Sequence, residues 1–399
     1  MKSMNRIIPF LVLWIFIDAC IDRIDLVVPA SSLGEIVVDG LITSDPGPYT
    51  VKLNSVIRTD DSHPLGLPLT ATKVIIADDA GNAEELQQVN NGEYQTKASG
   101  IRGVPGRSYH IRVEMGDGSV FESKPDKLGT VGTIDSIFWE FETVKKSDAP
   151  PEYRYRIFMN ASAATGADKF YRWKLNGTYV VRTEPKFTHC KPPPFGCHWC
   201  PDSCSGAIAL VGGGVPQDGY GINPETNKIE YIIGLKCTCC RCWVTAPENK
   251  PRVTDTRLSS NGKFLRVEMG TVPVNYYTFW EKYRVEVQQM SLSREAFDYW
   301  HAIQSQQEGI GSLFQPVGGK IPTNIFEVNN KVRAFGIFYA SAIHRKQIYL
   351  DKNTYRIPEI VIPQDDCEGV LRAGPIGMDC RIAFPGQRST TTRPADWVD

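Results

Sequence analysis

The stretch EIVVDGLI, residues 35–42, decides the fold class, because it opens a series of short segments with the pattern of β-strands. Apolar or β-branched residues recur in these segments at a period of two, which is typical of half-buried strands. Turn signals separate them, namely Gly81-Asn82, Asn91-Gly92 and Asp117-Gly118. Short, regularly spaced strands with such turns predict a β-sandwich over residues 35–130.

Longer strands follow a boundary near residues 128–133. The segments that predict them are rich in aromatic residues: IDSIFWEFE, YRYRIFMNASA, FYRWKLNGTYVV, KFLRVEM and RAFGIFYASAIHRKQIYL. They indicate a second β-rich domain over residues 131–399, with a cysteine-rich insertion at 186–243 and an irregular C-terminal tail. The expected fold is therefore mainly β, with two β-sandwich-like domains, the first immunoglobulin-like or prealbumin-like.

One amphipathic helix is predicted over residues 293–308, within SLSREAFDYWHAIQSQQEG. Ser293 is a suitable N-cap, Glu295 lies in the first turn, and Leu292 is placed to pack against Phe297. Aromatic residues recur along one face at helical spacing. This stripe indicates packing on a core rather than a cofactor site.

The N-terminal segment has the features of a bacterial export signal, over residues 1–19. Two cations, Lys2 and Arg6, precede an unbroken apolar run at residues 7–17. This run is too short to cross a hydrocarbon core of ~30 Å, which is typical of an export signal. The tetrapeptide Ile17-Asp18-Ala19-Cys20 resembles a lipobox, whose cysteine is acylated and becomes the mature N-terminus. Cys20 is therefore the predicted lipidation site, and residues 20–34 are the predicted tether. The alternative is an ordinary secretory signal.

The remaining ten of the eleven cysteines are an even number in an exported chain, where disulfides form and persist. They are all disulfide candidates: Cys190, Cys197, Cys200, Cys204, Cys237, Cys239, Cys240, Cys242, Cys367 and Cys380. Among eight clustered thiols the connectivity cannot be read from the sequence. A bond between Cys367 and Cys380 would close a loop worth roughly 3 kcal/mol.

Zinc is the alternative explanation for the cysteine-rich segment. Cys197, Cys200, Cys239 and Cys242 form two CxxC pairs, although their separation is about twice that of ordinary zinc ribbons. A redox role is a third possibility, but it needs a helix after the CxxC pair, and TCCRCWVTA favours a strand or loop. Disulfides are the interpretation that the compartment favours, with no metal and no other cofactor.

Charge and composition exclude several classes of protein. The net charge is −1 for the whole chain, and no basic run occurs, so nothing indicates nucleic-acid binding. The six histidines are scattered, and neither HExxH nor GxSxG is present. His301, on the predicted helix, is expected to be a partly buried structural residue. We therefore expect no catalytic residues, and the loop aromatics Phe195, Trp199 and Trp243 are the candidate ligand contacts.

Several motifs together resemble one known family in order and spacing: EIVVDGLI, SLSREAFDYW, GSLFQPVGGKIPTNI, AFGIFYASAIHRKQIYL, Cys242-Trp243 and MDCRIAFPG…RPADW. The family is domain of unknown function 4249, lipoproteins of Bacteroidota. The resemblance implies an outer-membrane lipoprotein commonly encoded beside a TonB-dependent transporter of SusC-like architecture, and it supplies no enzymatic residues. The sequence departs from the family in its cysteine density, which suggests a lineage-specific insertion.

The predicted function is a lipid-anchored protein of the outer membrane, on its periplasmic or cell-surface face. It is expected to act as an accessory or ligand-capturing subunit of a TonB-dependent nutrient transporter. One alternative is a surface adhesin or structural module, and another is an exported zinc-dependent hydrolase.

Overall fold

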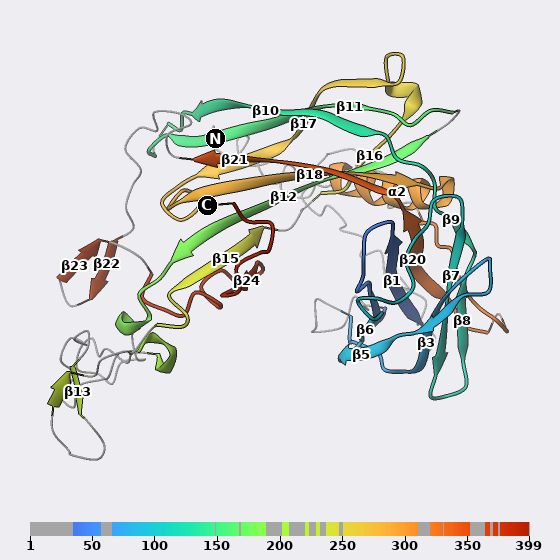
Figure 1. Cartoon of the computed structure of the whole chain (residues 1–399), viewed down its shortest axis with the longest axis horizontal. Coiled ribbons are helices and arrows are strands. Elements are labelled where there is room, and N and C mark those ends of the chain that lie inside the picture. The colour runs from blue at the N-terminus through green and yellow to red at the C-terminus, as the bar shows by residue number, and fades with distance from the viewer. Residues whose placement is uncertain are drawn as a thin grey trace, which may run out of the picture.

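The computed structural model describes residues 35–56, 66–147, 149–166, 169–188, 202–206, 220–222, 229–231, 237–246, 250–309, 320–329, 331–351, 364–367, 370–373 and 376–398. These residues are mainly β-strand, with one α-helix, and they form two sandwiches (Figure 1). The predicted fold class is confirmed. The predicted export signal and tether, including Cys20, lie outside the described residues.

The first sandwich is built around β1 (Ile36–Thr43), whose alternate residues Ile36, Val38 and Ile42 are fully buried. The other strands that the N-terminal part of the chain supplies are β2 (Thr50–Ser55), β3 (Ala71–Asp78), β4 (Ala83–Glu85), β5 (Gln87–Asn90), β6 (Glu93–Gln95), β7 (Ser108–Met115), β8 (Val120–Ser123) and β9 (Asp126–Lys127). The turns predicted at Gly81, Gly92 and Gly118 join paired strands, and each glycine has a positive φ that a tight turn requires.

Two strands from far along the chain complete the first sandwich: β19 (Ile325–Glu327) and β20 (Ala334–Ser341). β20 pairs in parallel with β1 over its whole length, and β19 pairs antiparallel with β8. The two sheets run in the orders β20-β1-β2-β6-β5 and β19-β8-β7-β3-β4, with β9 beside β7. The sequence predicted that residues 131–399 all belong to the second domain. The structure differs, because β19 and β20 pair with strands of the first sandwich. Local strand patterns do not indicate partners that are distant in the sequence.

The second sandwich packs a three-stranded sheet on a larger one. The first sheet has the order β10-β11-β17, and the second β21-β18-β12-β15-β24 with β16 also beside β12. The strands are β10 (Thr133–Val144), β11 (Glu152–Ser162), β12 (Phe170–Arg182), β15 (Arg241–Ala246), β16 (Arg252–Asp255), β17 (Lys263–Val274), β18 (Lys282–Leu292), β21 (Ile343–Asp351) and β24 (Arg388–Thr390).

Aromatic side chains fill much of the space between these two sheets. Tyr155 and Tyr171 are fully buried, and Trp173 donates its indole N–H to Gln289 at 2.9 Å. Tyr179 and Tyr283 stack with their ring centroids 5.5 Å apart. Offset-stacked and edge-to-face pairs of this kind stabilise a core beyond the area that they bury.

The remaining elements are short. They are the hairpins β13 (Tyr220–Ile222) with β14 (Ile229–Tyr231) and β22 (Gln364–Cys367) with β23 (Val370–Ala373), and the 3₁₀ helices η1 (Pro185–Phe187), η2 (Ser203–Ser205) and η3 (Thr256–Leu258). The C-terminal segment is less irregular than expected. β24 extends the larger sheet, and Trp397 is buried against Val180, Trp243 and Tyr349.

The predicted helix is α2 (Arg294–Gly309), which lies at the junction of the two sandwiches (Figure 1). Ser293 accepts a hydrogen bond from the Ala296 N–H at 3.1 Å, as expected of an N-cap. Phe297 packs against Phe170 of β12, with ring centroids 4.8 Å apart. No helix among the described residues is long and apolar enough to span a membrane.

Asp126 lies at the same junction and is only 3% exposed. Its carboxylate accepts a hydrogen bond from the Ala340 N–H of β20 at 2.8 Å. Burial raises the pKa of Asp126 to about 6, and hydrogen bonds from Ala340 and Ser293 only partly oppose this. The folded protein therefore holds a proton on Asp126 more tightly than the unfolded chain, whose aspartates have a pKa of about 4.

This difference predicts a pH-dependent stability. The free energy of unfolding should fall by at most about 3 kcal/mol as the pH rises from about 4 to about 6, because ionising Asp126 costs more in the folded state. Asp126→Asn should remove that part of the pH dependence. Urea unfolding of both proteins between pH 4 and 7.5 measures it, and parallel curves for the two proteins would contradict the assignment.

Candidate functional site

The larger sheet of the second sandwich has a gap along one edge of β12. β16 pairs with β12 as far as Trp173, and β15 pairs with it only from Gly177 onward. Neither of these two ladders includes residues 174–176, which pair with β18 on the other edge of β12. Pro251, immediately before β16, has no N–H with which to continue a ladder. Leu175 and Asn176, within this stretch, line a cavity between the two sheets.

A cavity of about 380 Å³ lies behind this gap, which is within the usual range for ligand pockets. Its walls come from β12, β17 and β18, and from residues that lie on or between β15 and β16. The described residues that line it are Leu175, Asn176, Gly177, Ala246, Lys250, Arg252, Met269, Gly270, Thr271, Val272, Pro273, Tyr283 and Val285. Most of them are apolar, and a few polar groups lie at the two ends.

Two glycines keep the cavity open. A Cβ atom on Gly177 would lie 1.8 Å from the hydroxyl oxygen of Tyr283, so any other residue there would displace the Tyr283 ring. Gly270 has a φ of +150° at an irregularity in the pairing of β11 with β17. A Cβ atom on Gly270 would lie 2.9 Å from Leu175. Isolated glycines inside strands commonly mark such bulges and close approaches.

The inner end of the cavity is apolar apart from the Tyr283 hydroxyl. Val285 is fully buried, and Met269 and Tyr283 are nearly so. Burial raises the pKa of Tyr283 above its ordinary value, and the adjacent Tyr179 raises it further. Tyr283 is therefore a neutral phenol at physiological pH, able to donate one hydrogen bond.

The outer end of the cavity carries two cations, Lys250 and Arg252. Lys250 is exposed and Arg252 is half-buried. Neither forms an ion pair with any carboxylate in the part of the chain that the structure describes. Glu268 lies near enough to Arg252 to feel its charge, but it makes its ion pair with Arg156. The described part of the mouth therefore carries positive charge.

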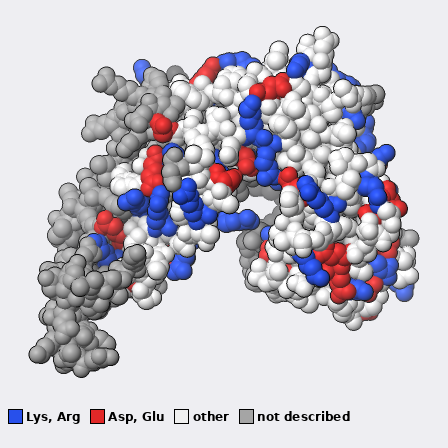
Figure 2. All heavy atoms as spheres, viewed as in Figure 1, with Lys and Arg blue, Asp and Glu red and all other residues white. Residues whose placement is uncertain are grey.

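The wider surface mixes both signs of charge. Figure 2 shows that this face is hollowed between the two sandwiches and that Lys and Arg side chains gather around the hollow. An ion pair between Arg345 of β21 and Asp45, just after β1, joins the two sandwiches. Exposed ion pairs of this kind contribute only about 0 to 1 kcal/mol each to the stability of the folded protein.

The cysteine-rich segment forms disulfides at the end of the second sandwich that is remote from the first (Figure 1). The three bonds among the described residues are Cys204–Cys239, Cys237–Cys240 and Cys242–Cys380. The bridge between Cys367 and Cys380 that the sequence allows is not formed, because Cys380 is bonded to Cys242. Cys190, Cys197 and Cys200 lie outside the described residues, as does the side chain of Cys367.

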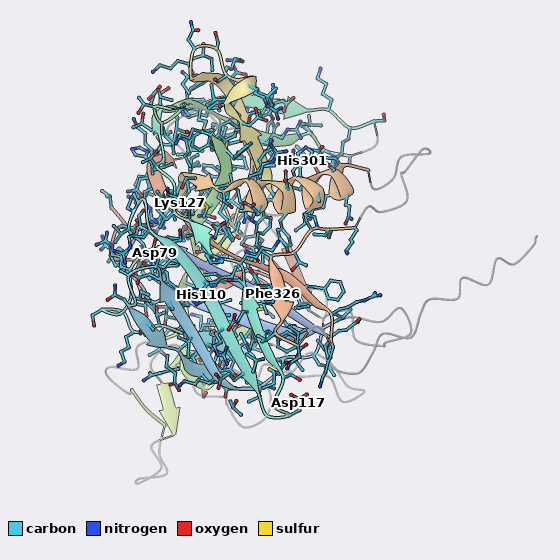
Figure 3. All side chains as sticks on the ribbon, turned by 90° about the vertical axis from the view of Figure 1, so that its right-hand side faces the viewer. Asp79, His110, Asp117, Lys127, His301 and Phe326 are labelled. Atoms are coloured by element: carbon cyan, nitrogen blue, oxygen red, sulfur yellow. A yellow bond between two sulfur atoms is a disulfide. The ribbon has the colours of Figure 1, made fainter. Side chains whose placement is uncertain are left out.

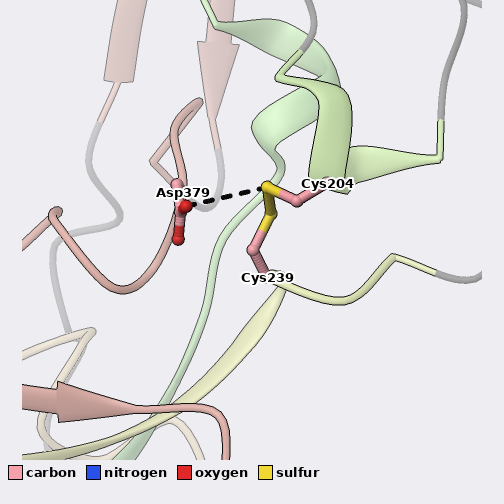
Figure 4. A group of neighbouring side chains, drawn as sticks. All are labelled: Cys204, Cys239 and Asp379. Atoms are coloured by element: carbon pink, nitrogen blue, oxygen red, sulfur yellow. Dashed lines mark hydrogen bonds between the residues drawn. A yellow bond between two sulfur atoms is a disulfide. The ribbon is translucent and has the colours of Figure 1, made fainter.

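The same bonds weaken the zinc alternative. Cys239 and Cys242 are the described members of the proposed ligand set, and each is oxidised with a different partner. Cys204, Cys239 and Asp379 lie together as three groups of metal-binding type (Figure 4). However, a disulfide sulfur is not the thiolate that zinc requires. Hydrogen bonds from Arg381 hold the pKa of Asp379 below its ordinary value.

The predicted aromatic contacts have a different outcome. Trp243 is 6% exposed and lies within β15, where it packs against Val180 and Trp397. It belongs to the core, so its prediction as a loop contact is wrong. Phe195 and Trp199 lie outside the described residues.

The described histidines do not form a cluster. His110 is on β7 and His301 is on α2, well separated in Figure 3. His301 is exposed rather than partly buried, and its ring stacks on Phe297 at 5.5 Å. His344 accepts a hydrogen bond from the Ile134 N–H at 3.1 Å, which is a structural role.

No motif in the sequence indicated the cavity, since its lining residues come from distant strands. The fold and this site define a class: a two-sandwich β protein with a cavity of ligand size. The chain matches the family described as Domain of unknown function (DUF4249) over residues 21–347, and it belongs to that family. The predicted family membership is thereby confirmed.

One solved structure that resembles the chain is a crystal structure of a candidate carbohydrate-binding protein from Bacteroides uniformis. The likeness covers 66% of this chain and 91% of that one, at 11% identity and a TM-score of 0.14. A likeness at this score supports no inference about fold or ligand. No curated protein matches the chain.

The disulfides generate a prediction with a built-in control. In the chain-entropy model, the stabilisation grows with the length of the closed loop. Cys242–Cys380 spans 138 residues and Cys237–Cys240 spans three. The double variant Cys242→Ala/Cys380→Ala should lose about 5 kcal/mol of unfolding free energy, whereas Cys237→Ala/Cys240→Ala should lose about 2 kcal/mol.

Urea unfolding of the two double variants measures the difference, and removing cysteines in pairs avoids leaving an odd thiol. Equal losses, or a larger loss for the short loop, would contradict the assigned pairing.

Proposed function

We propose that this protein is a lipid-anchored, ligand-capturing subunit that serves a TonB-dependent transporter of the outer membrane. The observation that carries the proposal is the cavity between the sheets of the second sandwich, with its apolar walls and charged mouth. A concave, mainly apolar pocket with a few convergent polar groups is the usual form of a small-molecule site. The lipobox at Cys20 and the family membership support the location.

The lining supports binding rather than catalysis. Nucleophilic and general acid–base mechanisms need a nucleophile or an acid beside a base that orients it. The described residues that line the cavity include no aspartate, glutamate, histidine, cysteine or serine, and no described hydrogen bond joins Lys250, Thr271 or Tyr283 to one another as a nucleophile and its base. Lys250, Arg252, Tyr283, Asn176 and Thr271 supply hydrogen bonds and positive charge, which suit recognition of a ligand.

The proposed lipid anchor would place this binding site close to a partner in the membrane. A lipid on Cys20 would confine the protein to the membrane surface and raise its effective concentration near a partner in the same membrane. In the proposed role this protein captures the ligand, and another chain supplies the pore through which the solute crosses the membrane. A TonB-dependent barrel is the partner that the family resemblance implies.

The anchor is tested by changing its attachment point. Cys20→Ala should move the protein from the membrane fraction to the soluble fraction, whereas Ser31→Ala, in the same tether, should leave it in the membrane fraction. Immunoblotting of the fractions measures the distribution, and mass spectrometry of the wild type should find an acylated Cys20. An unmodified Cys20 in a membrane-bound wild type would contradict the proposal.

The partner is tested by purification from intact membranes. Mild-detergent solubilisation followed by affinity purification through a C-terminal tag should recover a TonB-dependent transporter in near-equal amount. A stable contact of this kind should bury at least ~1,000 Å². Recovery of the lipoprotein alone, repeated after cross-linking in intact cells, would contradict the transporter role and favour the surface adhesin.

A further inference from the structure

The charged side chains among the described residues that line the cavity are all cations. Lys250 and Arg252 lie at its mouth, and no acidic residue is among the described residues that line it. Two described carboxylates close to lining residues have partners of their own. Glu268 pairs with Arg156, and Glu286 accepts hydrogen bonds from Asn176 at 3.3 Å and from Gln288 at 2.6 Å.

The gap in the sheet adds polar groups to the same opening. Residues 174–176 of β12 lie between the end of the β16 pairing and the start of the β15 pairing. Leu175 and Asn176, within this stretch, line the cavity and bring their backbone amide groups beside it. Thr271, exposed on the facing strand β17, lies at the other side of the cavity.

Beyond this polar rim the walls are apolar and deep. Leu175, Met269, Val272 and Val285 line the passage, and the Tyr283 hydroxyl lies at its inner end beside Gly177. A volume of about 380 Å³ accommodates a small molecule with one ring or a short branched chain, since it is near the lower end of the range for ligand pockets.

We propose that this cavity binds a small organic acid. Its carboxylate lies between Lys250 and Arg252, and its apolar body extends between the sheets toward the Tyr283 hydroxyl. This inference rests on the proposed function for its site and adds the class of ligand.

Physical chemistry favours a carboxylate at this position. A guanidinium presents paired donors that match the two carboxylate oxygens, and such charge-assisted hydrogen bonds are about twice as strong as neutral ones. The half-buried position of Arg252 reduces solvent screening of the pair. The apolar body of the ligand contributes to the binding free energy because it leaves water, at about 25 cal/mol for each Å² of apolar surface buried.

The test uses calorimetric titration of the unlipidated protein, residues 21–399, with three acids and their neutral amides. The acids are 3-phenylpropionate, 4-methylpentanoate and benzoate. At least one acid should bind about tenfold or more tightly than its amide, because only the acid pairs with the cations. Its affinity should also fall as salt rises from about 0.05 to 0.5 M, since screening weakens charge pairs near a surface.

Variants locate the binding. The double variant Lys250→Gln/Arg252→Gln should lower the affinity for the acid about tenfold or more and leave the amide unchanged. Gly270→Ala, which narrows the passage against Leu175, should weaken both ligands. Lys73→Gln, on β3 of the first sandwich, is the matched control and should change neither. Unchanged urea unfolding of each variant establishes that it is folded.

Two results would overturn the inference: no binding by any of the three acids at millimolar concentration, or equal affinity for acid and amide that the double variant leaves unchanged. This titration needs neither membrane nor transporter. Absence of acid binding alongside recovery of the transporter refutes only the ligand class. Acid binding without recovery of the transporter refutes only the transporter role.

Discussion

One run of chain, residues 334–351, holds the two sandwiches together. Its first half, β20, pairs in parallel with β1 over eight residues, and its second half, β21, pairs with β18 over nine. Only Ala342 separates the two strands, and its N–H donates to the Ser291 hydroxyl at 2.9 Å. Because backbone ladders on both sides fix the same short segment, the two sandwiches cannot turn freely about it.

The helix and Asp126 both make contacts at this junction. The guanidinium of Arg172 lies 3.6 Å from the ring centroid of Trp300 on α2, an interaction worth about 2 kcal/mol when desolvated. Asp126 binds the backbone of β20 beside the N-cap of the same helix. The larger sheet is built outward from this junction, because β21 pairs with β18 and β18 pairs with β12. On its other edge β12 pairs with two shorter strands, β15 and β16. The cavity lies beside the residues of β12 that neither strand pairs with.

Local features of the sequence predicted local features of the structure. Alternation in EIVVDGLI gave β1 its buried face, and glycine turns joined the strands as expected. Ser293 and Leu292 placed the start of the helix within one residue, because capping depends on neighbours in sequence. Each of these features is decided by fewer than about ten consecutive residues, which is the range that periodicity and capping describe.

Features that join distant residues were beyond such rules. The parallel pairing of β1 with β20 links residues almost 300 apart, and no alternation pattern specifies a partner. Cysteine counts indicated disulfides but not that Cys380 joins Cys242. Trp243 was expected in a loop, yet the β12–β15 pairing and the Trp397 side chain bury it. The cavity depends on where two strands stop beside β12, which only the assembled sheet defines.

The measurement that tests the account most directly is a crystal structure of the mature protein, purified without refolding from the cells that make it. The account predicts electron density for a small acid between the sheets of the second sandwich. Its carboxylate should contact Lys250 and Arg252, and its body should approach Tyr283. A cavity closed by the chain's own side chains, with Lys250 and Arg252 paired to its own carboxylates, would contradict it.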